Sequence, residues 1–587
     1  MRRQIIIFVF VVLCAGSPVV LADLNITFSI DTDAGRAPIS PYIYGANYSL
    51  GEEENLAARR TGGNRLTGYN WENNYSNAGS DWYHHSDHYL VQYLPPSQRL
   101  IPGICLTDFQ DSCLDAGEYP LVTLQMAGFV SADGDGTVTE EETAPSDRWK
   151  GVVYTKPTPF CDPTGDPDVD DDYVYMDELV NFLVDRYGDA STPTGVKAYS
   201  LDNEPALWPS THPRIHPDKV LCTELISRSV DLSSAVKNID PYAKIFGPAL
   251  YGFAAYLHLQ DAPDWGSVGG GYHWFIDYYL YRMSQESSAQ GRRLLDVLDL
   301  HWYPEAKGDG HRITDSLPSY SRANAEARMQ APRTLWDPGY IEDSWIGQWF
   351  SSYLPLLPEV WDSINTCYPG TKLAITEFTY GAPEHFSGGI AMADALGIFG
   401  KYGLFMSNYW GNDDDYVSAA YKIFRNYDGG DSIFGDTKVN ATMSDKVNSS
   451  VYASIFSEDD TQLHIIVINK NYDNAINGSF TISSPRSYGS GAVWAFDSTS
   501  PNITEITPVS SITSNSFSYT IPKLSVCHII LEAICPAGDI DGDCEVGWED
   551  LVILTENWLS VGGNSNLGGT GGVDFHDFAL LSQDWGL

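Results

Sequence analysis

The stretch GVKAYSLDNEP, residues 195–205, shows the pattern that decides the fold of this chain. A short apolar run leads into Asp, Asn and Glu, and Pro205 then ends the run because proline cannot continue a strand ladder. This order is typical of a buried parallel strand with polar side chains at its carboxyl end. We therefore expect Asn203 and Glu204 to lie at the rim of a sheet rather than in its core.

Seven further runs share this pattern and alternate with helical stretches. They are YIYGANYSL (42–50), RRTGGNRLTGYNW (59–71), YPLVTLQMAG (119–128), AKIFGPAL (243–250), VLDLHWYPE (297–305), KLAITEFTYG (372–381) and GLFMSNYWG (403–411). Two stretches between them, 176–188 and 223–240, carry apolar residues at helical spacing. Eight strands alternating with helices predict a (β/α)8 barrel over residues 39–436. An open doubly wound sheet is the alternative, but no G-x-G-x-x-G follows the first strand.

The segments that flank the barrel contain short alternating runs separated by Gly, Asn, Ser and Pro. Residues 437–534 include QLHIIVINKNY, NGSFTISSP and GAVWAFDS, which predict an antiparallel β-sandwich. Residues 24–38 begin with LNITFSIDTD in the same style, so we expect a strand there to join this sandwich. Residues 1–22 combine two arginines with a short apolar run and predict a secretory signal peptide. The run is too short for a comfortable membrane span, and no other segment predicts one.

The composition limits what the chain can bind. The formal net charge is −43, which argues against nucleic acid and anionic membranes as partners. The 16 Trp and 36 Tyr offer flat amphipathic rings on which sugars stack, and the many carboxylates suit calcium. We expect a monomer with a neutral substrate, structural calcium and no organic cofactor. An exported chain favours disulfides, and Cys105 and Cys113 are the expected pair.

Residues 536–587 contain an internal repeat whose copies start 27 residues apart, at Val546 and Val573. In DIDGDCEVGWED, positions 1, 3, 5 and 12 of an EF-hand-type loop are occupied by Asp539, Asp541, Asp543 and Asp550. Cys544 stands where such loops usually have glycine, and the second copy keeps fewer acidic residues. The repeat therefore predicts a small helical module with calcium in its first loop.

Two glutamates at strand ends suggest acid–base chemistry on a sugar. Glu204 and Glu377 lie at the ends of the fourth and seventh runs, and parallel strands place their carboxyl ends on one rim. Hydrolysis of a glycosidic bond needs two carboxyl groups, one protonated and one ionised. The candidate substrate-binding residues near this rim are Asn64, Arg65, Asn203, Trp208, His301, Tyr303 and Trp410. We also expect Tyr303 to hold the ionised Glu377 in place.

Long loops should wall a cleft around these residues. The chain from Glu204 to Glu377 spans 173 residues (377 − 204), whereas three plain barrel units need about 90–100. The extra length predicts insertions, for which residues 311–345 are the expected place.

Several motifs together resemble glycoside hydrolase family 44, which belongs to clan A. They are RRTGGNRLTGYNWENNYSNAGSDW (59–82), DDYVYMDELVNFLVDRYG (171–188), LDNEPALWPSTHPRIHP (201–217), DLHWYPEA (299–306) and AITEFTYG (374–381). The resemblance covers about residues 24–533 and implies a barrel plus sandwich with the activity of a retaining endo-β-1,4-glucanase or xyloglucanase. By motif position it implies Glu204 as general acid/base and Glu377 as nucleophile.

The resemblance implies further ligands and a partner. A structural calcium is implied at Glu72, Asp168 and Asp171. The C-terminal repeat is similar to a type I dockerin, which implies a cohesin-type scaffold partner and a place outside the cell, free or attached to the cell surface. Other clan A activities, such as a β-mannanase or an arabinofuranosidase, and a non-catalytic carbohydrate-binding subunit stay open as alternatives.

Overall fold

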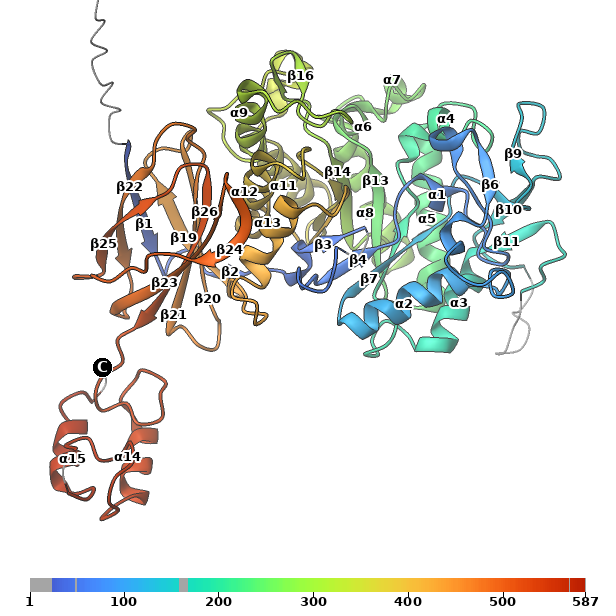
Figure 1. The fold of residues 1–587 in the computed structure, drawn as a ribbon. Helices are drawn as coiled ribbons and strands as arrows, with labels where there is room; N and C mark the ends of the chain where they lie inside the picture. The colour runs from blue at the N-terminus through green and yellow to red at the C-terminus, as the bar shows by residue number, and fades with distance from the viewer. Residues whose placement is uncertain (1–23, 48–49, 158–166, 570, 586–587) are drawn as a thin grey trace, which may run out of the picture.

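The computed structural model describes residues 24–47, 50–157, 167–569 and 571–585. It shows a barrel, a β-rich domain beside it and a small helical segment below that domain (Figure 1). The signal peptide predicted at residues 1–22 lies outside the described residues. Among the residues that are described, no helix is both long and apolar enough to cross a membrane.

The largest body is a closed barrel of eight parallel strands. Their order around the barrel is β12, β13, β14, β17, β18, β3, β4 and β7. The strands are β3 Gly45–Ala46, β4 Ala58–Arg60, β7 Tyr119–Leu124, β12 Ala198–Leu201, β13 Lys244–Leu250, β14 Val297–Trp302, β17 Lys372–Phe378 and β18 Met406–Tyr409. Each strand overlaps one of the eight predicted runs, and the predicted barrel is confirmed.

Helices surround the barrel because each has an apolar face to bury against the strands (Figure 1). The longer ones are α2 Ile104–Ala116, α3 Met176–Tyr187, α5 Cys222–Ile239, α8 Phe275–Gln290, α11 Leu356–Cys367, α12 Phe386–Tyr402 and α13 Asp415–Arg425. The disulfide expected between Cys105 and Cys113 is wrong, because both thiols are free. Both residues lie on α2, where eight residues span about 12 Å, too far for a disulfide.

Insertions after the barrel strands carry smaller elements. Between β14 and β17 lie β15 Lys307–Gly308, β16 His311–Arg312, α9 Arg322–Gln330, η5 Ala331–Leu335 and α10 Trp345–Trp349. The insertion predicted at residues 311–345 is therefore present. Insertions between β4 and β12 form two three-stranded sheets. One consists of β5 Ser76–Asn77, β6 His85–Asp87 and β9 Gly136–Thr137, and the other of β8 Phe129–Ser131, β10 Trp149–Val153 and β11 Tyr173–Tyr175.

The second body is the β-domain, made of β1 and β19–β26. Its sheet has the order β24-β23-β26-β21-β20-β19-β1-β22-β25, and the short β2 (Ala37–Pro38) pairs with β19 beside this path. The strands are β1 Leu24–Asp31, β19 Thr437–Met443, β20 Ser449–Ile455, β21 Gln462–Asn469, β22 Ile476–Ser483, β23 Tyr488–Asp497, β24 Ser500–Glu505, β25 Ser516–Ile521 and β26 Ser525–Ala533. Strand β1 lies between β19 and β22, so the N-terminal segment joins this domain as its sequence suggested. Alternate residues such as Phe28, Ile465 and Ile529 share one core.

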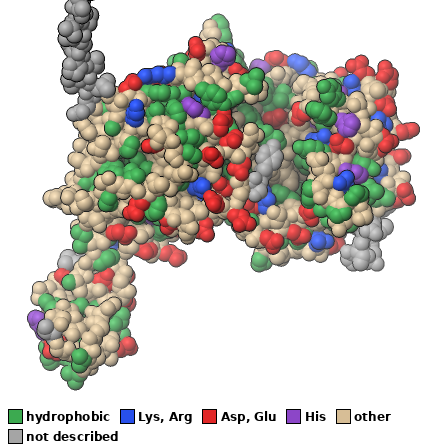
Figure 2. Space-filling view, viewed as in Figure 1, with side chains coloured by type: hydrophobic (Ala, Val, Ile, Leu, Met, Phe, Trp, Pro, Cys, Tyr) green, Lys and Arg blue, Asp and Glu red, His purple; other side chains and the backbone are tan. Residues whose placement is uncertain are grey.

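The third body is the repeat segment, residues 536–585. Its two copies form α14 Trp548–Glu556 and α15 Phe575–Leu581, which pack around a small core that includes Leu554 and Leu581. These two leucines occupy equivalent positions of the repeat. Figure 2 shows patches of hydrophobic side chains on the visible face of this segment, and Asp and Glu side chains on all three bodies.

Candidate active site

Glu204 and Glu377 lie at the same rim of the barrel. Glu377 is on β17, and Glu204 follows β12 with a left-handed φ of +46°, which is rare for a residue with a side chain. The turn is held by the buried Asp202, whose carboxylate accepts hydrogen bonds from the Thr67 hydroxyl (2.6 Å) and the Ala127 amide (3.0 Å). The strained turn brings the Glu204 carboxyl over the end of the barrel.

His301 joins the two glutamates into one cluster. One oxygen of each glutamate and one ring nitrogen of His301 all lie within 4.8 Å of one another. His301 Nδ1 is 2.9 Å from Glu204 Oε1 and 3.5 Å from Glu377 Oε2. The side chain is fully buried, and burial lowers the pKa of its imidazole. His301 was expected to bind the sugar, but its position below the carboxyl groups makes it a support for them instead.

Glu377 accepts hydrogen bonds at both carboxylate oxygens. The Arg60 guanidinium donates to Oε1 (2.8 Å), and the Tyr303 hydroxyl donates to Oε2 (2.9 Å). A carboxylate that accepts at both oxygens is fixed in orientation and has the geometry of an ionised group. Tyr303 therefore makes the contact to Glu377 that the sequence suggested.

The surroundings of Glu204 favour the protonated form of its carboxyl group. Burial raises the pKa of its carboxyl to about 7, Arg60 opposes this rise, and the carboxylate of Asp81 adds to it. Burial is thus the main cause of the raised pKa, and Asp81 is the acidic neighbour that adds to it. A carboxyl group with this pKa can carry a proton near neutral pH.

Arg60 is a site residue that the sequence-based reasoning missed. It is fully buried at the end of β4, and besides Glu377 its guanidinium contacts the Asn203 side-chain oxygen at 2.9 Å. The available signal was the pair of arginines, Arg59 and Arg60, at the start of a predicted strand, because an arginine that becomes buried is rare unless it is paired.

A cavity of about 390 Å³ opens above the glutamates. The predicted residues Asn64, Asn203, Tyr303 and Trp410 line it together with both carboxyl groups. Arg312 and Trp345, from the insertion between β14 and β17, also line it. The predicted insertion thus helps to form the wall of the cleft.

A second cavity of about 540 Å³ adjoins the first. The two share Gly63, Asn64, Asp81 and Trp410, so the cleft continues past the indole of Trp410. Arg65 lines only the second cavity, where its guanidinium pairs with Asp87 at 2.6 Å. Arg65, a candidate substrate-binding residue, therefore lies at this extension of the cleft.

Trp208 does not line either cavity. Its ring is fully buried, and its indole N–H donates to the Asn203 carbonyl at 3.2 Å. The expectation that Trp208 binds sugar is wrong, because the helical turn after Pro205 rotates this residue into the core. Leu207 faces the cavity in its place.

Comparison with known proteins gives the family. The model of glycoside hydrolase family 44 matches residues 75–306. Endoglucanase A of Paenibacillus lautus is 55% identical over 562 residues, which cover 95% of this chain and 80% of that protein. The chain belongs to glycoside hydrolase family 44. The barrel, the paired glutamates and the family agree that it is a glycoside hydrolase.

Two further relatives of this hydrolase have informative names. The structure of a Paenibacillus polymyxa xyloglucanase from family 44 with xyloglucan is 56% identical, with a TM-score of 0.84, and the match covers 86% of the hydrolase and 99% of that chain. Beta-mannanase/endoglucanase A of Caldicellulosiruptor saccharolyticus is 52% identical over 519 residues. That match covers 86% of the hydrolase but only 39% of the longer relative.

The calcium ligands implied for the barrel do not converge in this structure. Among the described residues, Glu72, Asp168 and Asp171 form no group of three ligand atoms within 4.8 Å. Instead the Lys150 ammonium donates to Glu72 Oε2 (3.0 Å) and to the Val169 carbonyl (2.7 Å). Burial raises the pKa of Glu72 to about 7. A lysine thus supplies the positive charge beside Glu72, and this arrangement does not fit a calcium site.

The first loop of the repeat segment fits a cation better. Asp539, Asp541 and Asp550 each offer a carboxylate oxygen, and these oxygens lie within 4.8 Å of one another. Asp550 also accepts the amide N–H of Ile540 (2.6 Å), which keeps its carboxylate turned into the loop. Asp543 is not part of this cluster of three. Hard oxygen donors gathered in this way are the ligand set that calcium prefers.

Proposed function

We propose that this family 44 hydrolase is a retaining endo-β-1,4-glucanase of the xyloglucanase type, with Glu377 as nucleophile and Glu204 as acid/base. The observation that carries the proposal is the short distance between the carboxyl groups, of which one oxygen each lies within 4.8 Å of the other. Retaining enzymes hold their carboxyl groups about 5–5.5 Å apart, whereas inverting enzymes leave about 6.5–9.5 Å for a water.

In the first step, a Glu377 oxygen attacks the anomeric carbon of the bound glucosyl unit. The bond from that carbon to the glycosidic oxygen breaks, and the proton of Glu204 moves to the leaving oxygen. The hydrogen bonds from Arg60 and Tyr303 hold Glu377 on the line of attack, which lowers the entropic cost of reaching the transition state. The product of this step is a glucosyl ester of Glu377.

In the second step, water replaces the departed sugar. Glu204, now ionised, takes a proton from this water while the water oxygen attacks the anomeric carbon. The ester bond to Glu377 breaks, and both glutamates return to their starting protonation states. Two displacements at one carbon leave its configuration unchanged.

The shape of the cleft supports cleavage inside a chain. The cavity above the glutamates continues into a second cavity beside Trp410, so an extended glucan can lie across the rim. The ring of Trp410 lines both cavities and provides a stacking surface between them. Product analysis on long xyloglucan and on carboxymethylcellulose, with β-mannan and arabinoxylan as controls, measures this preference directly.

The stereochemistry of the product tests the mechanism. We expect proton NMR of an early digest to show the β-anomer of the new reducing end first, followed by mutarotation. An α-anomer as the first product contradicts the assignment of a nucleophile.

A substitution of the nucleophile tests the residue assignment. Glu377→Ala removes the attacking oxygen and should lower kcat by about 10⁴-fold or more. Circular dichroism and the unfolding midpoint of this variant show whether the fold is intact. The surface variant Glu286→Gln, on α8, serves as the control and should keep full activity. An active, folded Glu377→Ala enzyme contradicts the proposal.

We further propose that the enzyme is secreted as a monomer and that the repeat segment is a dockerin-like calcium module. The carboxylate cluster of Asp539, Asp541 and Asp550 supports calcium there. Trp548 and Phe575, at equivalent positions of the two copies, are 70% and 78% exposed and offer apolar surface to a cohesin-type partner. N-terminal sequencing of exported protein that begins at Met1 contradicts the proposed leader, and size-exclusion chromatography with a cohesin panel tests the partner.

A further inference from the structure

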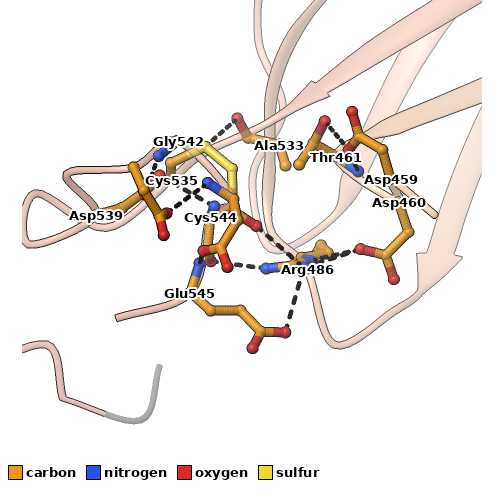
Figure 3. The surroundings of a disulfide bond; sticks show 12 residues. Asp459, Asp460, Thr461, Arg486, Ala533, Cys535, Asp539, Gly542, Cys544 and Glu545 are labelled. Atoms are coloured by element: carbon orange, nitrogen blue, oxygen red, sulfur yellow. Dashed lines mark hydrogen bonds and ion pairs between the residues drawn. A yellow bond between two sulfur atoms is a disulfide. The ribbon is translucent and has the colours of Figure 1, made fainter. Parts of the chain in front are cut away.

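A disulfide links the end of the β-domain to the first loop of the repeat segment (Figure 3). Cys535 follows β26 after one residue, and Cys544 is the sixth residue of the loop that starts at Asp539. Cys544 has a φ of +60°, in the left-handed region that glycine normally occupies at this place in such loops. The covalent link is therefore made at the turn of the loop itself.

Arg486 provides a second link between the same two bodies (Figure 3). It lies in the turn between β22 and β23, and its Nη1 donates to the Cys544 carbonyl at 2.7 Å. Its Nε donates to Asp460 of the β-domain at 2.9 Å, and its Nη2 is 3.5 Å from the Glu545 carboxylate. The Asn515 side-chain amide donates to the Arg486 carbonyl (2.7 Å), which fixes the turn.

The chain that connects the β-domain to the repeat segment is held at its first residues. The amide of Ala533 donates to the Thr461 carbonyl (2.8 Å), and the amide of Ile534 donates to the Ser487 carbonyl (2.6 Å). The backbone is thus bound to the β-domain up to the residue before Cys535. A freely swinging linker would show none of these contacts.

The disulfide also affects the hydrogen bonds within the first loop of the repeat segment. The two carboxylate oxygens of Asp539 accept the amide N–H groups of Gly542 (2.7 Å) and Cys544 (3.0 Å). Cys544 therefore orients a carboxylate of the acidic cluster while its sulfur ties the loop to the β-domain. Fixing such a residue in advance reduces the conformational entropy that cation binding would otherwise cost.

We infer that the Cys535–Cys544 disulfide and Arg486 form a two-point lock, which holds the repeat segment in one orientation on the β-domain and keeps its first loop in a cation-binding shape. The second half of this inference rests on the calcium site proposed above. The first half stands on the contacts between the two bodies alone. The lock makes the repeat segment a fixed extension of the enzyme instead of a tethered module.

Orientation is tested with the full chain, without calcium, by small-angle X-ray scattering and by limited subtilisin digestion. The test variant combines Cys535→Ser, Cys544→Gly and Arg486→Ala. Glycine fits the left-handed φ of residue 544, so this variant loses the links without adding strain to the loop. We expect a larger maximum dimension and cleavage within residues 534–538 at least about tenfold faster than in the wild type, because an opened linker exposes its backbone.

The matched control for orientation is Arg282→Ala. Arg282 is a surface arginine of α8 that lies 3.6 Å from Glu286 and donates to the Tyr278 hydroxyl at 3.1 Å, and both partners are on the same helix. This control should give the scattering curve and the cleavage rate of the wild type. Activity on soluble glucan should be unchanged in both variants, which shows that the barrel is folded. A triple variant with the wild-type curve and cleavage rate overturns the lock.

The second half of the inference, that the lock keeps the first loop in a cation-binding shape, is tested by calcium affinity. The affinity is measured by isothermal titration of calcium chloride into the metal-free full chain. We expect the variant with Cys535→Ser and Cys544→Gly to bind calcium on the order of tenfold more weakly than the wild type, because its loop is less ordered before binding. Equal affinity in both proteins overturns this half. A wild type that binds no calcium at this loop refutes the proposed calcium site together with this half, while the scattering result still decides the lock.

Discussion

Tyr303 holds the carboxylate that we assign as nucleophile through a single hydrogen bond from its hydroxyl. Tyr303→Phe removes this donor but keeps the ring in the wall of the cavity. A hydrogen bond to a charged group contributes about 1.5–3 kcal/mol, so we expect kcat to fall by about 10–100-fold while KM changes little. Steady-state kinetics on a soluble glucan measure both. A variant with full kcat shows that Arg60 and His301 position Glu377 without Tyr303.

Asp81 influences the proton that Glu204 must donate. Its carboxylate helps to raise the pKa of Glu204, which burial brings to about 7. Glu204 acts as acid only while protonated, so activity should fall as the pH rises through this pKa. Asp81→Asn removes a charge that favours the protonated form and should move the alkaline limb of kcat/KM to lower pH, by about half a pH unit.

The pH profile of kcat/KM measures this effect, with Glu286→Gln on the surface of α8 as the control. The control should leave the limb in place, because its charge lies outside both cavities. A limb that moves to higher pH in Asp81→Asn contradicts the sign of the argument.

At the scale of elements, the turn between β4 and α1 (Asn64–Thr67) positions the aromatic floor of the cleft. Gly63 has a φ of +86°, and a Cβ there would lie 2.3 Å from the Trp410 ring. Gly63→Ala should therefore displace Trp410, raise KM for long glucans by about tenfold and cost about 1 kcal/mol of stability.

Gly117→Ala is the matched control for this turn. Gly117 has a similar φ of +70° but open space around its missing Cβ. It should show the same loss of stability without the change in KM. If both variants raise KM equally, backbone strain and not the displaced indole causes the effect.

The barrel strands were predictable from sequence because a buried strand and its polar end form a local pattern. The end of helix α3 at Tyr187, just before Gly188, is a local pattern of the same kind. Trp208 was not predictable, because the direction of a side chain after Pro205 depends on a turn whose shape is set by distant contacts to Asp202. Arg60 was missed because its partners, Glu377 and Asn203, come from other strands far along the chain.

The pairing of the cysteines also depends on the three-dimensional structure. Cys105 and Cys113 are close in sequence, but a helix places them too far apart for a bond. Cys535 and Cys544 are nine residues apart and do bond, because the loop between them turns back. Sequence separation alone therefore does not decide which pair forms.

On the scale of the whole molecule, a buried ion pair joins the barrel to the β-domain. Lys470 follows β21, and its ammonium lies 3.1 Å from the carboxylate of Asp394 on α12, with both side chains fully buried. Lys470→Met leaves the Asp394 charge buried without its partner. We expect a loss of about 3–5 kcal/mol in the free energy of unfolding, measured by chemical denaturation.

The exposed pair between Arg322 and Asp473 is the control for this prediction. It also joins the two bodies, at 2.6 Å, but both side chains are about half exposed. Arg322→Ala should cost far less stability than Lys470→Met, because water screens and replaces the interaction. Equal losses in the two variants contradict the argument that burial makes Lys470 important.

Strand β1 is synthesised long before the strands that cover it in the β-domain. It leaves the ribosome before the barrel does, and its partner Ser444 lies 417 residues after Thr27 in the chain. At about 5–20 residues per second, translation leaves Ile26, Phe28 and Ile30 without their partners for about 20–80 s. A chain that ends before β19 leaves the apolar residues of β1 without their partners, so chaperones and proteases can recognise the unfinished product. These residues become buried in the β-domain only after the whole catalytic barrel has been synthesised.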